Sequence, residues 1–313
     1  MIMLRSALLA LTFLFAACGS NAGADPAPSS GEPGPTTGAT SDASASAPAP
    51  ALVDGGSPGS APVSRCRATA AEVTCTSHQL SLAAQLLPRD VFYEVPLGTA
   101  PAKGWPVAFF FQGSFVAASG TFVAKKDDRF GLFNMTLTVK ELLDHGYAVL
   151  APNAVVEGRT AWQTNIPPWS TLWSTSSDDA FMKAIFDAVG GGKFGALDAS
   201  RMYAMGISSG GFMTSRMAVS YSGKFRALAV HSGGYATCST TCTLPGTLPS
   251  DHPPTLFLHG AKDSIAPPST MELYRDALVA QGHTVQTLID PNAGHEWLTA
   301  GPAAILAWFD ANP

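Results

Sequence analysis

The chain has 313 residues, of which 46% are hydrophobic and 13% are charged. This length allows one large or two small domains, with enough residues to bury a full core. The formal charge is −5, but residues 65–313 hold 17 basic and 19 acidic residues and are nearly neutral. Nucleic-acid binding needs a positive surface that displaces counterions from phosphates. Because the longest basic cluster is Lys125-Lys126, we exclude a nucleic-acid partner.

The first eighteen residues, MIMLRSALLALTFLFAAC, have the features of an export signal. Arg5 precedes an apolar run from Ala7 to Phe15, and two alanines stand before Cys18. This run is too short to span a bilayer. We therefore predict a signal peptide over residues 1–17 and lipidation of Cys18, as in a bacterial lipobox, with plain secretion as the alternative.

Residues 18–64 have the composition of a linker. After Cys18, all but eight of them are Gly, Pro, Ala, Ser or Thr. Such a segment cannot bury enough apolar surface to offset the entropy of ordering it. As a flexible chain it would hold the domain roughly 40 Å from a membrane anchor. It would either help a surface enzyme reach bulky material or act as a passive tether. The lipid on Cys18 is the only contact with a membrane that we predict.

Residues 65–313 are predicted to form one domain that contains four of the five cysteines. An even number of cysteines in an exported chain indicates two disulfides, although four cysteines allow three connectivities. Proximity favours Cys66–Cys75 and Cys238–Cys242. The seven histidines are scattered, and no CxxC or HExxH motif occurs, so we expect neither a metal nor another cofactor.

Short apolar runs recur through this domain, and each is followed by a polar or glycine-rich turn. Runs that are apolar throughout are typical of strands buried on both faces, in a mostly parallel sheet. The predicted strands are Val91–Val95, Val107–Phe111, Tyr147–Ala151, Met202–Gly206, Ala227–His231, Thr255–His259 and Val285–Ile289. The predicted helices are Leu137–His145, Asp178–Val189, Gly210–Ser220, Pro268–Gln281 and Pro302–Phe309. This alternation predicts an α/β fold, a doubly wound sheet with helices on both faces.

One predicted strand leads into the pentapeptide GISSG at residues 206–210. A G-x-S-x-G motif alone is weak evidence, and the linker contains another at residues 55–59. In a nucleophile elbow the serine lies in a strained turn from strand to helix, where small neighbours allow close packing. Ser208 has this setting, so we predict that it is a nucleophile rather than an ordinary turn serine.

A serine nucleophile needs a histidine base and an acid that orients this base. Asp263 follows the strand Thr255–His259, and His295 lies in the loop after Val285–Ile289. The order Ser, Asp, His, with each residue beyond a strand end, matches the α/β-hydrolase arrangement. We therefore predict a triad of Ser208, Asp263 and His295.

Four other residues could compete for these roles. His231 and His259 end strands and are alternative bases, but a histidine just before the acid turn is poorly placed between serine and acid. Asp251 and Asp290 are alternative acids. Structural roles are favoured for both histidines.

Four ordered motifs resemble those of α/β-hydrolases of the esterase and polyhydroxyalkanoate-depolymerase type. GISSGGFM resembles their elbow, KFRALAVHSGG their next strand, HGAKDSIAPPS their acid turn and GHEW their histidine loop. The resemblance extends from about Val91 to Pro313 and implies a serine ester hydrolase that works through an acyl-enzyme.

The sequence departs from these esterases after the third core strand. FFFQGSF has Gln112-Gly113 where they commonly have His-Gly. By position, the backbone N–H groups of Ser114 and Ser209 should form the oxyanion hole. Because these donors belong to the main chain, loss of the histidine does not remove them.

The segment Val155–Ser177 bears on the substrate, because it follows a strand end and contains Trp162, Trp169 and Trp173. These rings would either line an aromatic cleft for an acyl chain or polymer, or pack on the domain as a structural loop. Between Gly233 and His252 there is no room for a large cap, so the site should be open.

The sequence thus predicts an exported, monomeric ester hydrolase that acts on a polyester. A carboxylesterase for small acetyl or feruloyl esters and a peptidase with the same triad are alternatives. A surface lipoprotein that binds glycans or partners without catalysis is a third alternative, against which the intact triad argues.

Overall fold

The computed structural model describes residues 64–85, 87–154, 161–238 and 242–313. The predicted signal peptide, the lipidation of Cys18 and the linker up to residue 63 lie outside these residues. Ser64 was assigned to the linker, but its backbone N–H donates to Asp144 Oδ1 at 3.2 Å and so ties it to the domain. None of the described helices has the length and the apolar run needed to cross a membrane.

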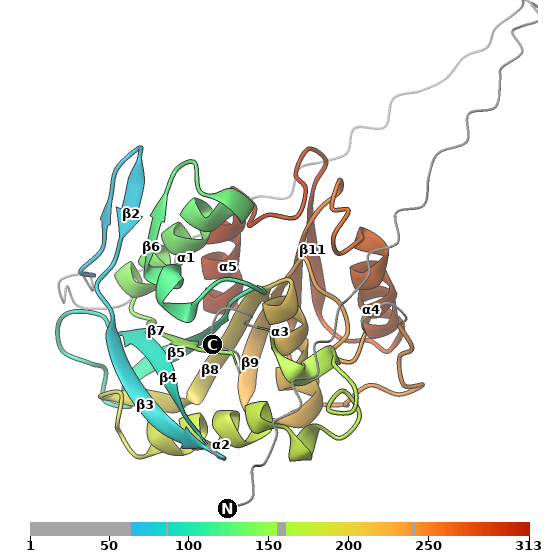
Figure 1. The fold of residues 1–313 in the computed structure, drawn as a ribbon, viewed down its shortest axis with the longest axis horizontal. Helices are drawn as coiled ribbons and strands as arrows, with labels where there is room; N and C mark the ends of the chain where they lie inside the picture. Colours follow the sequence, from blue (N-terminus) through green and yellow to red (C-terminus); the bar gives the residue numbers. More distant parts are fainter. Residues whose placement is uncertain (1–63, 86, 155–160, 239–241) are drawn as a thin grey trace, which may run out of the picture. The chain divides into compact units, whose positions relative to one another are not determined.

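An eight-stranded sheet lies at the centre of the domain, with β3 and β4 at one side and β11 at the other (Figure 1). Its strand order is β11-β10-β9-β8-β5-β7-β4-β3. Neighbours from β11 to β7 pair in parallel, whereas β4 pairs antiparallel with both β7 and β3. The strands are β3 (His78–Ala84), β4 (Leu87–Glu94), β5 (Trp105–Phe111), β7 (Ala148–Pro152), β8 (Leu197–Ile207), β9 (Phe225–His231), β10 (Thr255–Gly260) and β11 (Val285–Asp290). The predicted mostly parallel sheet is confirmed, and each predicted strand overlaps one of these.

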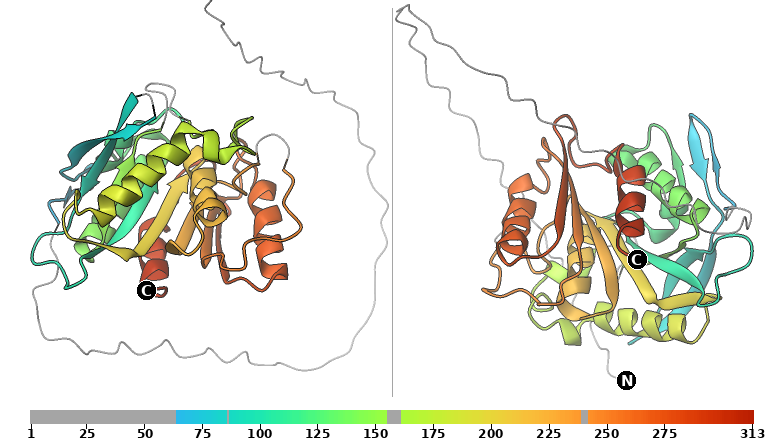
Figure 2. Two further views of the ribbon diagram at one scale, coloured as in Figure 1. Left: turned by 90° about the horizontal axis from the view of Figure 1, so that it is seen from below. Right: turned by 180° about the vertical axis from the view of Figure 1, so that it is seen from behind.

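Helices cover both faces of this sheet, as the views in Figure 2 show. One face carries α1 (Leu132–Asp144) and α5 (Gly301–Asp310). The other carries α2 (Ser177–Gly190), α3 (Ser209–Ser220) and α4 (Pro268–Ala280). Four short 3₁₀ helices lie in the connections: η1 (Ala118–Phe122), η2 (Arg129–Gly131), η3 (Gln163–Asn165) and η4 (Trp173–Thr175). All five predicted helices are present, and the doubly wound architecture is confirmed.

The central strand β5 shows why the apolar runs are continuous. Successive side chains of a strand point to opposite faces. Phe110 is buried on the α1/α5 side, where its ring lies 5.2 Å from that of Trp297. Phe109 and Phe111 are buried on the side of α2 and α3. Because each buried Phe contributes about 1.5–3 kcal/mol, both faces of the strand favour apolar residues.

Four strands were not predicted. The burial of β3 alternates along its length, because this strand lies at the edge of the sheet. Three others form a separate small sheet: β1 (Arg67–Ala68), β2 (Glu72–Thr74) and β6 (Val123–Lys125). Strands of two or three residues are too short to produce a recognisable pattern.

Both favoured disulfides are present. The Cys66–Cys75 bond closes the hairpin of β1 and β2, and the Cys238–Cys242 bond lies between β9 and β10. The described residues of this second connection contain no helix, so they form no helical cap.

Strand register brings the predicted site loops together at the carboxyl ends of the parallel strands. Ile207 of β8 pairs with His231 of β9, and Gly260 of β10 pairs with Asp290 of β11. In parallel strands the carboxyl ends share an edge, which is where ligands bind in open α/β sheets. The loops after β8, β10 and β11 therefore leave from this edge together.

Candidate active site

Ser208 occupies the turn between β8 and α3. Its backbone angles are φ 58° and ψ −123°, a conformation that costs about 1–3 kcal/mol for a residue with a side chain. Its N–H donates to the His231 carbonyl oxygen at 3.0 Å. A Cβ atom on Gly206 or on Gly210 would overlap the carbonyl oxygen of Phe111. Both glycines of the motif are therefore required, because the start of α3 approaches β5 closely.

Asp263 and His295 form a directly bonded pair. His295 Nδ1 lies 2.7 Å from Asp263 Oδ2, and Asp263 Oδ1 accepts the N–H groups of Ile265 and Ala266 at 2.9 Å. Burial alone would raise the pKa of Asp263, but hydrogen bonds from His259, His295 and the backbone hold this pKa well below its usual range. An ionised carboxylate only accepts, so the proton lies on His295 Nδ1 and Nε2 is free to act as an acceptor.

Ser208 and His295 line the same cavity, which has a volume of about 330 Å³. This is near the lower end of the ~300–1,000 Å³ range of small-molecule sites. Gly113 and Ser114 also line it. The other described residues of the lining are apolar: Phe115, Val116, Phe130, Leu132, Met135, Ile207 and Ile265. The structure thus brings Ser114, Ser208 and His295 to one apolar cavity.

Three apolar side chains at this cavity are largely exposed, and we call them the rim. They are Phe115 at 81%, Ile265 at 64% and Phe130 at 48% exposure. The Phe130 ring is nearly perpendicular to that of His295, with centroids 6.3 Å apart. Exposed apolar residues gathered at a cavity mark a binding surface. Sequence analysis missed the rim, although Phe115 directly follows Ser114 and could have been included on that basis.

His259 and the two alternative acids have other partners. His259 Nε2 lies 2.8 Å from the Ala266 carbonyl oxygen and 3.4 Å from Asp263 Oδ2, so it supports the acid turn. Asp290 Oδ1 accepts the N–H of the nearby Asn292 at 2.8 Å. Asp251 accepts a hydrogen bond from the hydroxyl of Ser222. His259 thus has the structural role favoured for it, and neither aspartate is hydrogen-bonded to His295.

His231 holds the loop that carries His295. Its Nε2 accepts the N–H of Leu298 at 2.9 Å, and its ring stacks on Trp297 with centroids 4.9 Å apart. Burial is the main cause that lowers the pKa of His231 to about 3, and the nearby His259 and His295 lower it further. The ring is therefore neutral and remains an acceptor, which is a structural role.

Two of the three tryptophans predicted to bind substrate lie in the core. Trp162 is 0% exposed, and its ring meets that of Phe111 edge-on at 5.2 Å. Trp173 is 7% exposed, and its indole N–H donates to the Tyr221 hydroxyl at 3.2 Å. The aromatic-cleft interpretation is wrong for both, because packing takes up their rings. Trp169 is half-buried and does not belong to the lining of the cavity.

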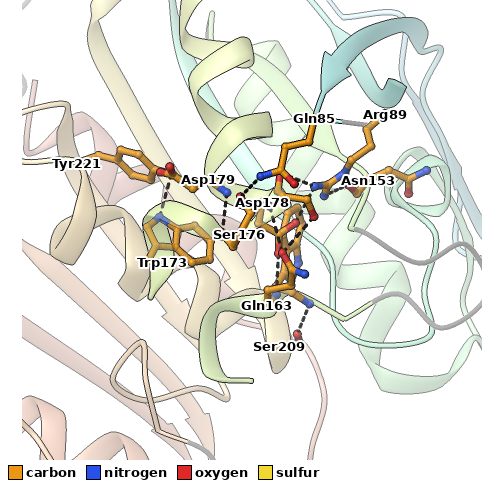
Figure 3. A network of polar contacts seen from close by, with 12 residues as sticks. Gln85, Arg89, Asn153, Gln163, Trp173, Ser176, Asp178, Asp179, Ser209 and Tyr221 are labelled. Atoms are coloured by element: carbon orange, nitrogen blue, oxygen red, sulfur yellow. Dashed lines mark hydrogen bonds and ion pairs between the residues drawn. The ribbon is translucent and has the colours of Figure 1, made fainter. Parts of the chain in front are cut away.

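A buried polar network ties the Trp162 segment to the domain (Figure 3). Arg89 pairs with Asp178 at 2.7 Å, and Asp178 Oδ2 accepts the Gln163 N–H at 2.6 Å. Burial lowers the pKa of Arg89 and raises that of Asp178, while the attraction between the two opposes both shifts. At one end of the network, Ser209 Oγ accepts the backbone N–H of Trp162 at 3.0 Å.

The fold is that of an α/β-hydrolase. The dienelactone hydrolase-like promiscuous phosphotriesterase P91 from metagenomic libraries is similar, with a TM-score of 0.56 and 16% identity over 77% of this chain and 99% of that chain. The Bacillus cereus carboxylesterase has a TM-score of 0.52 and 15% identity over 72% of this chain and 95% of that chain. The Pyrococcus horikoshii acylaminoacyl peptidase has a TM-score of 0.55 and 13% identity over 76% of this chain, which spans only 41% of that peptidase.

Sequence comparison gives the family. Residues 125–309 match the dienelactone hydrolase family. A poly(3-hydroxyoctanoate) depolymerase from Pseudomonas fluorescens is 49% identical over 245 residues, which cover 78% of this chain and 87% of the depolymerase. The chain belongs to the dienelactone hydrolase family and is a carboxylic ester hydrolase.

The neutral state of His231 predicts a loss of stability in acid. Its pKa is about 3 in the folded protein and ~6.5 in an unfolded chain, so the unfolded state binds a proton that the folded state does not. This contribution is complete above pH ~6.5 and is lost as the pH falls toward 3. We expect the melting temperature of His231→Gln to fall less steeply than that of wild type between pH 6.5 and 4.5 in scanning calorimetry. The exposed His78, replaced in the same way, is the control, and equal slopes for wild type and H231Q would contradict the assignment.

Proposed function

We propose that Ser208 is the nucleophile, His295 the general base and Asp263 the acid that orients it. One observation carries this proposal: His295, fixed by Asp263 at 2.7 Å, lines the same cavity as the strained Ser208. A histidine held on Nδ1 by a carboxylate presents Nε2 to a serine, as the chemistry requires.

The reaction would proceed in two halves. Ser208 Oγ attacks the ester carbonyl carbon while His295 Nε2 takes its proton. The tetrahedral intermediate collapses, the alcohol leaves with the proton from His295, and an acyl group remains on Ser208. Water, deprotonated by His295, then attacks this acyl group and releases the acid, which restores the serine.

The backbone N–H groups of Ser114 and Ser209 would stabilise the oxyanion. Ser209 is the first residue of α3, and the first N–H groups of a helix have no partner within it. The positive end of the helix dipole also favours a negative charge there. A Cβ atom on Gly113 would lie 3.6 Å from that of Ser208, so the segment that leads to Ser114 lies against the nucleophile.

The cavity and the rim favour an uncharged aliphatic substrate. Among the described residues that line the cavity, His295 is the only one with an ionisable side chain. The 49% identical relative is named as a depolymerase of poly(3-hydroxyoctanoate), an aliphatic polyester. We infer that the cavity takes a short apolar segment of such a polymer and that the rim contacts the units beside it. The predicted export and the tether of residues 18–63, on a lipidated Cys18 or released by secretion, would bring a monomeric domain to this insoluble material.

Ser208→Ala tests the proposed function directly. We expect it to lower hydrolysis of p-nitrophenyl octanoate by about 10⁶-fold, as does His295→Ala, because either change removes the nucleophilic step. Asp263→Asn should retain more activity, since it mainly misorients the imidazole. Circular dichroism checks that each variant is folded, and the exposed Ser222→Ala is the matched control. Turnover by S208A at the wild-type rate would refute the assignment.

Phe115→Ala tests the role of the rim. Contact of this ring with a polymer buries apolar area worth about 1.5 kcal/mol, so we expect degradation of a polyhydroxyoctanoate emulsion to fall about tenfold. Hydrolysis of p-nitrophenyl acetate should fall much less, because that ester is too small to reach across the rim. Val279→Ala is the control. Val279 is 58% exposed near the end of α4, where the chain returns to the amino end of β11, whereas the rim lies at the carboxyl ends of the strands. Equal loss on both substrates in F115A would argue for an enzyme of small esters.

A further inference from the structure

Trp162 connects the two segments that carry the proposed oxyanion-hole donors. Its backbone N–H donates to Ser209 Oγ at 3.0 Å, and its indole Nε1–H donates to the Gln112 carbonyl oxygen at 3.1 Å. Gln112 directly follows β5 and lies two residues before Ser114, and Ser209 opens α3. One buried residue therefore bonds to both segments, which are about a hundred positions apart in the sequence.

We propose that Trp162 is a positioning residue that fixes the Ser114 and Ser209 N–H groups relative to each other. The inference rests on the proposed function. The Gln112 carbonyl and the Gly113 N–H belong to one planar peptide unit, so the indole bond sets the plane from which the chain turns to Ser114. The second bond restrains the side chain of Ser209, whose own N–H is the other donor.

The surroundings of Trp162 make it a rigid support. The ring is 0% exposed and packs edge-on against Phe111. The Arg89 guanidinium lies 5.8 Å from the centroid of the ring. Arg89 is held in turn by Asp178, which also accepts the N–H of Gln163, the next residue in the chain (Figure 3). A buried ion pair thus fixes both the ring and the backbone beside it.

The side chain of Gln112 anchors the same peptide from the other side. In the amide orientation that satisfies both partners, Nε2 donates to the Pro152 carbonyl oxygen and Oε1 accepts the Ala154 N–H, each at 2.9 Å. The end of β5 is thereby tied to the end of β7, at the position where the sequence departs from the His-Gly of related esterases. The Gln112 peptide is therefore held by its own side chain and by the Trp162 indole.

An oxyanion hole works only if its donors are in place before the charge develops. Loss of one donor costs about 10²–10³ in kcat, so a small displacement of a donor costs less. We call the two hydrogen bonds of Trp162, to the Gln112 carbonyl oxygen and to Ser209 Oγ, the brace. The brace should therefore affect the transition state and leave binding of the substrate in the ground state nearly unchanged.

The test is Trp162→Phe, which keeps a buried ring and removes the indole N–H. With p-nitrophenyl octanoate we expect kcat to fall about tenfold and KM to change by less than about twofold. An alkylboronic acid, to whose boron Ser208 Oγ adds, forms a tetrahedral adduct with one oxygen in the hole. Its Ki should rise by the same factor by which kcat/KM falls.

Trp308→Phe is the matched control. Its indole N–H also donates to a backbone carbonyl at 3.1 Å, that of Leu228, and the residue is buried in α5. We expect kcat and Ki of this variant to stay within about twofold of wild type. The same kcat in W162F as in W308F would overturn the proposal, as would a rise in KM with Ki unchanged.

Two further variants keep the test decisive. If W162F does not fold, Ser209→Ala removes only the Oγ acceptor and leaves its backbone donor, and a fall in kcat with a matching rise in Ki is again expected. Unchanged values in S209A would then overturn the brace. Ser208→Ala, assayed alongside, separates the two proposals. Turnover by S208A at the wild-type rate would refute the proposed function, whereas the expected loss of about 10⁶-fold in S208A with a normal W162F would refute the brace alone.

Discussion

The strained backbone of Ser208 is the constraint on which the site depends. A serine at φ 58° and ψ −123° lies outside the conformations that its side chain prefers, so neighbouring structure must hold it there. The His231 carbonyl does so from β9, and close packing of α3 on β5 does so from the other side. The sharp turn that results points the serine into the cavity and leaves the first N–H groups of α3 open beside it.

The parallel sheet then assembles the other groups around this turn. Because the carboxyl ends of β8, β9, β10 and β11 share an edge, residues far apart in sequence meet there. Asp263 fixes His295 by a charge-assisted bond, and His231 holds the loop that carries this histidine. Trp162 adds a third connection, between the end of β5 and the start of α3. Hydrogen bonds from its partners keep Asp263 ionised against the effect of burial, and burial keeps His231 neutral, so each group is in the protonation state that its bond requires.

Most of the fold could be predicted from sequence, because strands buried on both faces are continuous apolar runs. Edge strand β3 was missed because only one of its faces is buried, so it forms no continuous apolar run, although its alternation of apolar and polar residues is typical of a half-buried strand. Motif context was enough to select Asp263 and His295, which the structure joins. A tryptophan in a loop can face the solvent or the core. Trp162 faces the core because its ring contacts Phe111 and Arg89, which are far from it in the sequence. Phe130 is a lone aromatic residue in a polar segment, so no periodicity marks it as part of the rim.

The most direct test of this account is a crystal structure of the protein after reaction with a p-nitrophenyl alkylphosphonate. Phosphorus should be bonded to Ser208 Oγ, with the phosphonyl oxygen within hydrogen-bond distance of the backbone N–H groups of Ser114 and Ser209. The alkyl chain should lie in the apolar cavity toward the rim. Phosphorus on another residue, or a phosphonyl oxygen that points away from both N–H groups, would contradict the account.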